Sequence, residues 1–381
     1  MLTKPRLEFN WCAPVSGDGF YLGLPLWERP PSLEYTVEIF KTAERFGFGQ
    51  VLIGMGFNHH VMEAWTLATA VLALTINAGA MVAVRPGFYS APILAKMAVT
   101  LDHISKGRLS LNIVTGGRPT EQAMYGDYLD HDSRYRRTRE FMQICRQLWS
   151  TTNPFDYEGE FYQLHQTRLE TLPLQPSGPL FYFGGASEMA QQVGAEFADV
   201  YLMWGEAQQQ LADRINRMQQ LVTNCGRKKA VRFGLRINII ARPSEIEARK
   251  TAREMLAKVS PQVLAKARAT EFPNPKRESI GQSRQWELRG NADEDWYIEP
   301  LLWAGISVVR SGAGMAIVGS YQQVAERLLN YIDLGITVFI LSGYPHLEEC
   351  ENVGRNVLPL VREAYLQRSC KSPFVYLCQG Y

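Results

Sequence analysis

The sequence predicts an α/β fold in which eight parallel strands close into a (β/α)8 barrel. Three observations carry this prediction. Short runs of β-forming residues alternate with longer stretches of helical periodicity along most of the 381 residues. The β runs are continuously apolar, which is typical of strands buried on both faces of a parallel sheet. There are eight of them, and eight βα repeats in one chain favour a closed barrel over an open, doubly wound sheet.

The elements follow one another in the order that such a barrel requires. We expect strands at residues 7–13, 50–53, 78–84, 109–114, 180–183, 200–203, 231–241 and 337–341. One helix is expected after the fifth strand, and the last helix of the chain is expected at residues 321–334. The other helical patterns between the strands lie at residues 35–46, 64–74, 91–104, 134–149 and 207–225. This alternation is that of a TIM barrel, and we expect residues 1–381 to form a single domain.

Two segments interrupt the alternation. Residues 151–178, rich in Pro, Tyr and Gln, are expected to form an excursion that includes a small hairpin. Residues 270–305 contain prolines and many charged side chains, which is compatible with a solvated surface insertion. Since this segment comes just before the last βα unit, we expect it to be a mobile lid that closes the barrel mouth and excludes water. A C-terminal tail is expected from about residue 366.

Composition and charge exclude several classes of protein. Hydrophobic residues make up 46% of the chain and the formal net charge is +2, so we expect neither disorder nor binding of nucleic acid or an anionic membrane. The six cysteines show no CxxC pair and no spacing with His that is typical of a metal site. The first residues show no signal-peptide pattern, and no run reaches the roughly 18 apolar residues of a membrane span. We therefore expect a cytoplasmic protein without a metal ion.

Active-site residues of a (β/α)8 barrel come from the carboxyl ends of its strands. After the fifth strand, Gly184-Gly185-Ala186-Ser187 combines turn glycines, a helix N-terminus and a hydroxyl group, which together favour a phosphate site. A serine N-cap after turn glycines is the alternative interpretation. No GxSxG elbow, Walker loop or carboxylate pair is evident at the strand ends, so we expect a bound cofactor to carry the chemistry.

Polar residues also lie at the ends of the last two strands. Arg236 and Asn238 are two residues apart in an otherwise apolar strand, so they share one face, which we take to be the lumen. A charge inside a barrel is costly unless it is paired, so Arg236 either has a carboxylate partner or binds an anion, and Arg310 is placed to join it. Tyr344 and His346 follow the last strand. His346 suits acid–base chemistry, and a solvent-exposed histidine is the alternative.

Five motifs around these positions resemble those of the bacterial luciferase-like flavin monooxygenases. They lie at residues 17–23, 100–102, 112–116, 130–135 and 341–349 (GDGFYLG, TLD, NIVTG, DHDSRY and LSGYPHLEE). The likeness extends from about Leu7 to Arg362 and is strongest to the alkanesulfonate monooxygenases of that family. It implies a barrel that uses O2 and reduced FMN (FMNH2), with a separate NAD(P)H-dependent flavin reductase as partner. It also implies a homo-oligomer, either a dimer or a tetramer.

The resemblance assigns roles position by position. It implies that the flavin and its phosphate are held by Asn112, Thr115, Tyr135, Gly185, Ala186 and Ser187, with Trp204 as an aromatic at the mouth. It implies that the substrate end consists of Arg236, Arg310, Tyr344, His346 and Asn238, the two arginines binding an anionic group. The chain departs from the sulfonate enzymes at Ser16 and Asn238, where they carry His, and at Ala186, where the phosphate loop has serine. The loop at residues 56–61 lacks the cysteine of the family.

The reaction that this resemblance implies is oxygenation of an alkanesulfonate or other organosulfur compound, with release of sulfite and an aldehyde. Two alternatives stay open. One is a related enzyme that acts on dimethyl sulfone or a pyrimidine-type ring, or a deazaflavin-dependent dehydrogenase. The other is a flavin-binding protein without turnover.

Overall fold

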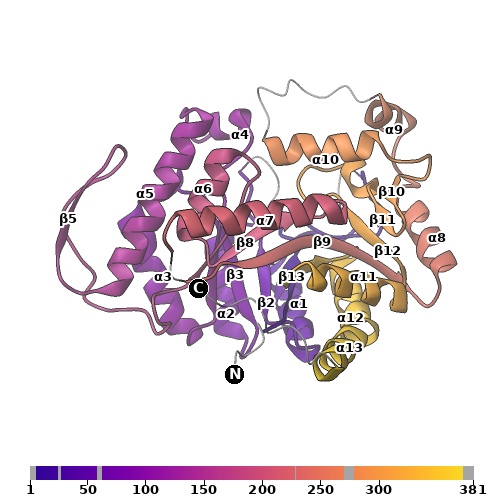
Figure 1. Cartoon of the computed structure of the whole chain (residues 1–381), viewed down its shortest axis with the longest axis horizontal. Helices are drawn as coiled ribbons and strands as arrows, with labels where there is room; N and C mark the ends of the chain where they lie inside the picture. The colour runs from indigo at the N-terminus through magenta and orange to yellow at the C-terminus, as the bar shows by residue number, and fades with distance from the viewer. Residues whose placement is uncertain (1–5, 25–26, 58–61, 228, 270–278, 372–381) are drawn as a thin grey trace.

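A computed structural model describes residues 6–24, 27–57, 62–227, 229–269 and 279–371 of the chain. Within these residues, eight parallel strands form a closed barrel with helices around it (Figure 1). The barrel strands are β1 (Glu8–Ala13), β2 (Gln50–Ile53), β3 (Gly79–Val84), β4 (Leu109–Ile113), β7 (Leu180–Gly184), β8 (Val200–Trp204), β9 (Arg232–Arg242) and β13 (Ile336–Ser342). The ring closes where β8 pairs with the first half of β9, with Val200 opposite Arg232. The predicted (β/α)8 barrel is therefore confirmed.

The outside of the barrel is covered by helices that follow the strands (Figure 1). They are α1 (Leu33–Arg45), α2 (Ala64–Leu74), α3 (Ala91–Ser105), α5 (His131–Ser150), α6 (Glu188–Phe197), α7 (Gln208–Asn224), α11 (Tyr321–Asp333), α12 (His346–Asn356) and α13 (Leu358–Lys371). The short helix α4 (Pro119–Ala123) lies between β4 and α5, beside Gly116. Several begin at a serine whose hydroxyl accepts a hydrogen bond from a backbone N–H of the first turn, as Ser32, Ser187 and Ser320 do. This N-cap satisfies one of the amides that a helix start leaves without a partner.

Alternation along the strands separates the lumen from the helix side. On β1, Phe9 and Trp11 pack with the helices, whereas Cys12 packs against the apolar cluster inside the barrel. That interior cluster consists of Leu52, Met81, Tyr182, Val200, Val338 and Ile340. At the amino end of the barrel, Glu8 forms an ion pair with Arg232, with 3.0 Å between Oε2 and Nη1. The apolar layer thus separates this ion pair from the carboxyl end, where the predicted site residues lie.

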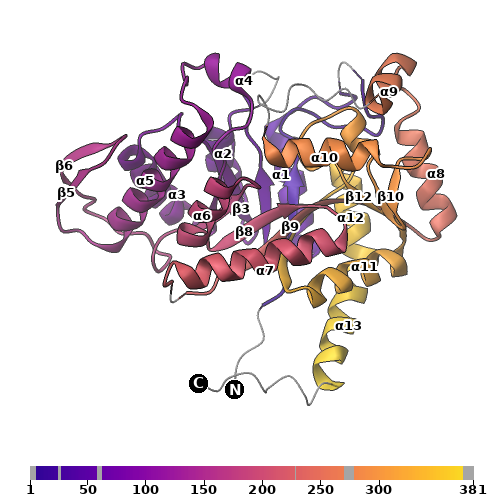
Figure 2. The same cartoon turned by 45° about the horizontal axis from the view of Figure 1, so that its top comes forward.

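The two predicted insertions add elements outside the barrel. Residues 151–178 contain the antiparallel hairpin of β5 (Phe155–Glu158) and β6 (Gln163–Thr167), which projects beyond α5 in Figure 2, so the predicted hairpin is confirmed. The elements between β9 and β13 are α8 (Glu245–Met255), α9 (Pro261–Arg268), α10 (Ile280–Gly290), β10 (Tyr297–Glu299), β11 (Leu302–Trp303), the 3-10 helix η1 (Gly305–Val308) and β12 (Ala316–Ser320), followed by α11. The part of the expected lid at residues 270–278 lies outside the described residues.

Two predictions about the last third of the chain are wrong. The helix and strand expected at 321–341 are not the last elements, because α12 and α13 follow them, and the expected tail from residue 366 begins inside α13. The inward face of α12 combines the apolar Cys350 and Val353 with the buried polar residues His346 and Glu349. The pattern also did not indicate β12, which runs parallel to the outer half of β9.

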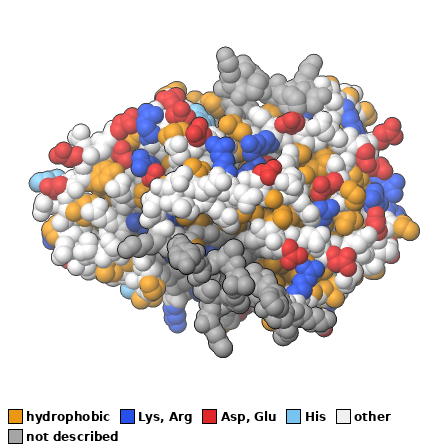
Figure 3. All heavy atoms as spheres, in the orientation of Figure 1, with side chains coloured by type: hydrophobic (Ala, Val, Ile, Leu, Met, Phe, Trp, Pro, Cys, Tyr) orange, Lys and Arg blue, Asp and Glu red, His pale blue; other side chains and the backbone are white. Residues whose placement is uncertain are grey.

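The surface carries both signs of charge. In Figure 3 acidic and basic side chains are interspersed over the face shown, in keeping with a formal net charge of +2. No helix in the described part of the chain is both long and apolar enough to cross a membrane. The same residues contain no group of three or more His, Cys, Asp or Glu placed to hold a metal ion.

Candidate active site

The predicted phosphate residues meet at the N-terminus of α6. Ser187 is buried and caps this helix, its Oγ accepting a hydrogen bond from the Ala190 backbone N–H at 3.2 Å. The Tyr135 side chain of α5 hydrogen-bonds to Ser187, and the Tyr201 hydroxyl donates to the Gly185 carbonyl. A Cβ on Gly185 would lie 3.2 Å from the Tyr135 Oη and would clash with Ala190, so the loop requires glycine there. A helix N-terminus with free amides and two hydroxyls beside it suits a phosphate.

Asn112 and Thr115 lie nearby at the end of β4. Asn112 is half-buried, and Thr115 Oγ1 lies 3.2 Å from Thr138 Oγ1 of α5. Beside Gly116, the buried amide of Gln122 on α4 has no hydrogen-bond partner for either its nitrogen or its oxygen within the described residues. Buried amides are rarely left unpaired in folded proteins, and the Gln122 amide has one donor group and one acceptor to offer a bound molecule at this strand end.

Helix α10 of the expected lid covers this region. A Cβ built on Gly281 would lie 3.5 Å from the Trp204 ring and 3.9 Å from the Ala186 Cβ, so the first turn of α10 rests on these two residues. One turn later, the Gln285 Nε2 donates to the Gly205 carbonyl at 3.0 Å, and Gln285 Oε1 accepts from the Gly314 backbone N–H at 3.1 Å. The helix therefore ties the end of β8 to the loop that precedes β12.

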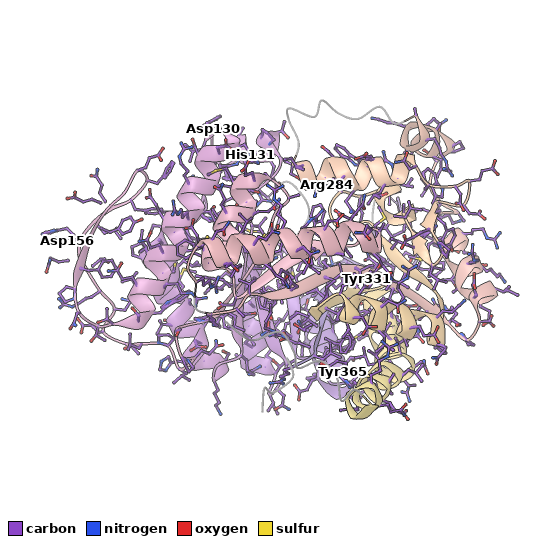
Figure 4. All side chains as sticks on the ribbon, in the orientation of Figure 1. Asp130, His131, Asp156, Arg284, Tyr331 and Tyr365 are labelled. Carbon is purple, nitrogen blue, oxygen red and sulfur yellow. The ribbon has the colours of Figure 1, made fainter. Side chains whose placement is uncertain are left out.

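Arg284 lies on the same stretch of α10 as Gly281, three residues further along. Burial raises the pKa of Tyr201, whose hydroxyl donates to the Gly185 carbonyl. The positive charge of Arg284 is one of those that lower this pKa again, so the guanidinium lies near the Gly185 loop. Figure 4 shows Arg284 at the same edge of the molecule as Asp130 and His131, where α5 begins. The described part of the chain gives the Arg284 guanidinium no ion-pair or hydrogen-bond partner.

The second group of predicted residues lies between β9, β13 and the loop before β12. The Arg236 Nη1 donates to Ser342 Oγ at 2.8 Å, and Ser342 Oγ donates to Asn238 Oδ1 at 2.5 Å. The Asn238 Nδ2 donates to the carbonyls of Ala313 and Met315, both at 3.0 Å. Both amide hydrogens of Asn238 are thus used to hold this loop. Ser342, a residue at the end of the eighth strand to which the sequence assigned no role, orients Arg236.

Arg310 stands at the start of that loop. Its Nη1 donates to the Tyr344 hydroxyl, and the Tyr344 ring stacks on Trp27 with 6.1 Å between ring centroids. Desolvation by the surrounding protein and the charge of Arg236 lower the pKa of Arg310, although its side chain keeps access to solvent. Neither guanidinium has a carboxylate partner in the described residues. Among the residues that the structure describes, the site therefore presents two positive charges that no carboxylate neutralises.

His346 is buried, with 3% of its surface exposed, so the alternative of a solvent-facing histidine is wrong. Its Nδ1 lies 2.9 Å from Asp18 Oδ1, and its backbone N–H donates to Asp18 Oδ2 at 2.6 Å. Burial alone would lower the pKa of His346, but the Asp18 carboxylate and a hydrogen bond with Cys12 outweigh it and raise the pKa above 6.5. The imidazole is therefore held in position and biased toward its protonated form.

Several of these side chains were given no role from the sequence. Asp18 and Ser342 lie at the ends of the first and eighth predicted strands and inside motifs that carried the resemblance, so the signal for them was available. Cys12 has the strand register of a lumen residue, whereas nothing local marks Gln122 or Arg284. Residues 58–61, which include part of the departure after the second strand, lie outside the described residues.

Comparison with known proteins agrees with this architecture. A model of the luciferase-like monooxygenase family matches residues 7–338. The structure of a riboflavin lyase with modified FMN and riboflavin superposes with a TM-score of 0.79 at 19% identity, over 95% of this chain and 92% of that chain. EDTA monooxygenase from Chelativorans sp. BNC1 gives 0.76 at 17% identity, over 94% of both chains. The coenzyme F420-dependent tetrahydromethanopterin reductase from Methanopyrus kandleri gives 0.66 at 16%, over 93% of this chain and 99% of that chain.

At such identities the structural likeness establishes the fold, while the family match rests on the sequence itself. That match begins at the first barrel strand and ends within the eighth, so it covers the first seven barrel strands and the residues around the α6 N-terminus, and it ends before Ser342, Tyr344 and His346. On this ground, the chain belongs to the luciferase-like monooxygenase family.

Proposed function

We propose that this protein is a two-component monooxygenase that uses reduced FMN and O2 to oxygenate a small organic anion. The substrate class that we propose is an alkanesulfonate or a related organosulfur compound, converted to sulfite and an aldehyde. The observation that carries the proposal is the pair Arg236 and Arg310, two guanidiniums at the carboxyl end of the barrel without a carboxylate partner in the described residues. Guanidinium groups bind oxyanions through paired, charge-assisted hydrogen bonds, which suits a sulfonate.

The residues at the other group fit FMN. The α6 N-terminus, Ser187 and Tyr135 suit the phosphate, and a Cβ at Gly185 would fill the loop that receives it. The unpaired amide of Gln122 offers one donor and one acceptor to the polar edge of a flavin ring. Bound reduced FMN would supply the reaction with O2 that transfers one oxygen atom to the substrate.

The chain's own residues would bind, orient and shield the reactants. Arg236 and Arg310 hold the anionic group, and Tyr344 fixes the Arg310 guanidinium. Asn238 fixes the loop that carries Arg310, so we assign it a positioning role rather than contact with substrate. His346, with Nδ1 occupied by Asp18, keeps Nε2 for giving or taking a proton. Helix α10 covers the flavin side and excludes water.

The cofactor and the need for O2 are tested together. The protein is supplied with reduced FMN by an NADH-dependent flavin reductase, which is the kind of partner that we propose, and loss of an alkanesulfonate is measured. We expect consumption under air and none under argon. Turnover that runs without O2 and requires reduced F420 would instead assign a deazaflavin-dependent dehydrogenase. FMN binding without loss of any substrate would assign a flavin-binding protein.

A further inference from the structure

Ser342 lies between the two arginines of the candidate anion site, and the proposed oxygenation gives it no role. It is the last residue of β13 and is fully buried. In the register of the parallel strands β9 and β13, Ser342 stands opposite Asn238, and Ile340 stands opposite Arg236. Because side chains alternate along a strand, Arg236 and Asn238 share one face of β9, and the Ser342 hydroxyl contacts both of them.

The direction of each hydrogen bond in this group follows from the chemistry of its members. A guanidinium has donors only, so the Ser342 oxygen accepts from Arg236 Nη1, which lies 2.8 Å away. Asn238 uses its Nδ2 group for the carbonyls of Ala313 and Met315, so its Oδ1 is the acceptor that faces Ser342. The Ser342 proton is therefore donated to Asn238 Oδ1 at 2.5 Å. A hydroxyl used in this way orients its neighbours and has no proton left for a substrate.

The loop that carries Arg310 needs such anchors because it is rich in glycine. Gly312 has a φ of +95°, and a Cβ built there would meet no described atom within 4 Å, so packing does not restrict this position. The backbone N–H groups of Gly312 and Gly314 donate to two glutamines of α10, at 2.7 and 3.1 Å. Two carbonyls of the loop accept from Asn238 at 3.0 Å. The loop is thus held between α10 and Asn238, and Asn238 is in turn oriented by Ser342.

Both guanidiniums keep N–H groups for a ligand. Within the described residues, the Arg236 side chain donates only through Nη1, whose other acceptors are the carbonyls of Ile237 and Ile340 at 3.3 and 3.4 Å. The Arg310 side chain donates only to the Tyr344 hydroxyl in the same part of the chain. The remaining donors of the two arginines can bind one oxyanion together, provided that both side chains are held in place.

We propose that Ser342 is a positioning residue that joins Arg236 and Arg310 into one binding unit for a tetrahedral oxyanion such as a sulfonate. Its hydroxyl orients Arg236 directly and holds the Arg310 loop through Asn238, so loss of the hydroxyl weakens both arginine contacts at once. The inference rests on the anion-binding part of the proposed function and not on the oxygenation.

The first test measures anion binding without turnover. Inorganic sulfate has a tetrahedral oxyanion but no carbon to oxygenate, and its affinity is measured by calorimetry with an excess of oxidised FMN to fill the proposed phosphate site. We expect Ser342→Ala to weaken sulfate binding by about tenfold, and Ser342→Thr, which keeps the hydroxyl, to weaken it by less than about threefold. The control is Ser150→Ala, which removes an exposed hydroxyl at the end of α5 and should leave the affinity unchanged. Equal affinities of the native protein and Ser342→Ala, or no sulfate binding by the native protein, would overturn the proposal.

The second test examines whether Ser342 acts on both arginines. Sulfate affinity is measured for Arg236→Lys and for Arg310→Lys, each with and without Ser342→Ala, because lysine keeps the charge but lacks the planar fork that Ser342 helps to orient. Groups of one hydrogen-bond network have non-additive effects, so we expect the combined loss of affinity to be at least about threefold smaller than the product of the single losses in both pairs. Losses that multiply in the Arg310 pair would show that Ser342 acts on Arg236 alone and would refute the joint unit.

Turnover separates this inference from the proposed function. With reduced FMN supplied under air, we expect Ser342→Ala to raise KM for an alkanesulfonate by about tenfold and to keep kcat within about twofold, since the hydroxyl orients the binding groups and does not touch the reacting atoms. A lower kcat with unchanged KM would indicate a smaller fraction of active protein and would contradict the positioning role. Sulfate binding that shows the expected coupling, without loss of any sulfonate, would support the joint unit and refute the oxygenation.

Discussion

At the scale of single residues, Arg284 gives the most specific prediction about cofactor binding. It lies on the turn of α10 that covers the Gly185 loop, and the described residues leave its guanidinium without a partner. A phosphate bound at the α6 N-terminus would supply one. FMN and riboflavin differ only in that phosphate. Comparing their affinities therefore distinguishes a contact of Arg284 with the phosphate from a contact with the flavin ring.

We expect Arg284→Gln to weaken FMN binding by about tenfold and to leave riboflavin binding unchanged, because one charge-assisted hydrogen bond is lost. Quenching of flavin fluorescence measures both affinities. Glu287→Gln, on an exposed position of the same helix, is the control and should change neither. An equal loss of affinity for both flavins would contradict the phosphate contact.

At the scale of elements, Asp18 joins the loop after β1 to the starts of α1 and α12. Its carboxylate accepts hydrogen bonds from the His346 backbone N–H at 2.6 Å, from the Tyr35 hydroxyl at 2.5 Å and from the Gly19 backbone N–H at 2.9 Å. Burial would raise the pKa of Asp18, but His346 and Tyr35 outweigh it and lower the pKa below 3.8. The contact between Asp18 and His346 is therefore strongest when the carboxylate is ionised and the imidazole is protonated.

The pH dependence of stability follows from the direction of these two shifts. The raised pKa of His346 contributes stability that is complete below its unfolded value of 6.5 and is lost as pH rises through the folded value. The lowered pKa of Asp18 contributes stability that is complete above its unfolded value of 3.8 and is lost as pH falls through the folded value. Stabilisation by the pair is thus greatest between these two unfolded values.

We expect His346→Asn to lower the free energy of unfolding by about 3 kcal/mol at mildly acidic pH, since it removes one partner of a buried ion pair, and by less at alkaline pH. Urea unfolding of both proteins at several pH values measures this difference. A difference that stays constant with pH would show that the imidazole acts through packing alone.

At the same scale of elements, helix α10 is held over the barrel mouth by two glutamines. Besides Gln285, Gln282 holds it to the Arg310 loop by accepting a hydrogen bond from the Gly312 backbone N–H at 2.7 Å. The covering position expected of a lid is therefore present in its described part. Its mobility stays a prediction.

At the scale of the whole molecule, the barrel could be predicted from the sequence, whereas the contacts between the residues of its site could not. Strand β2 and helix α2 begin and end where the sequence predicts them, because continuous apolar runs and helical periodicity are local signals. Asp18 and His346 are 328 residues apart, so no local pattern connects them.

The homo-oligomer that the resemblance implies has a candidate surface. Helices α2 and α3 pack side by side and, with the turn after α2, expose Leu74 (56%), Ile76 (79%), Ile93 (57%) and Ile104 (46%). We propose that a second copy covers these side chains, since exposed apolar residues on neighbouring helices favour association. Ile76→Lys with Ile104→Lys should reduce the mass measured by light scattering to that of one chain. Ile246→Lys, on α8 and 80% exposed, should not change it. An unchanged mass in the double variant would place the interface elsewhere.

The measurement that tests the central claim most directly is sulfite release from a series of alkanesulfonates, with reduced FMN supplied under air, for the native protein and for Arg236→Ala. We predict sulfite from the native protein with a preference for one chain length. For Arg236→Ala we predict at least a hundredfold loss, about 3 kcal/mol of transition-state stabilisation, with FMN binding retained. Oxidation of flavin without sulfite for any sulfonate, or equal sulfite from both proteins, would contradict the account.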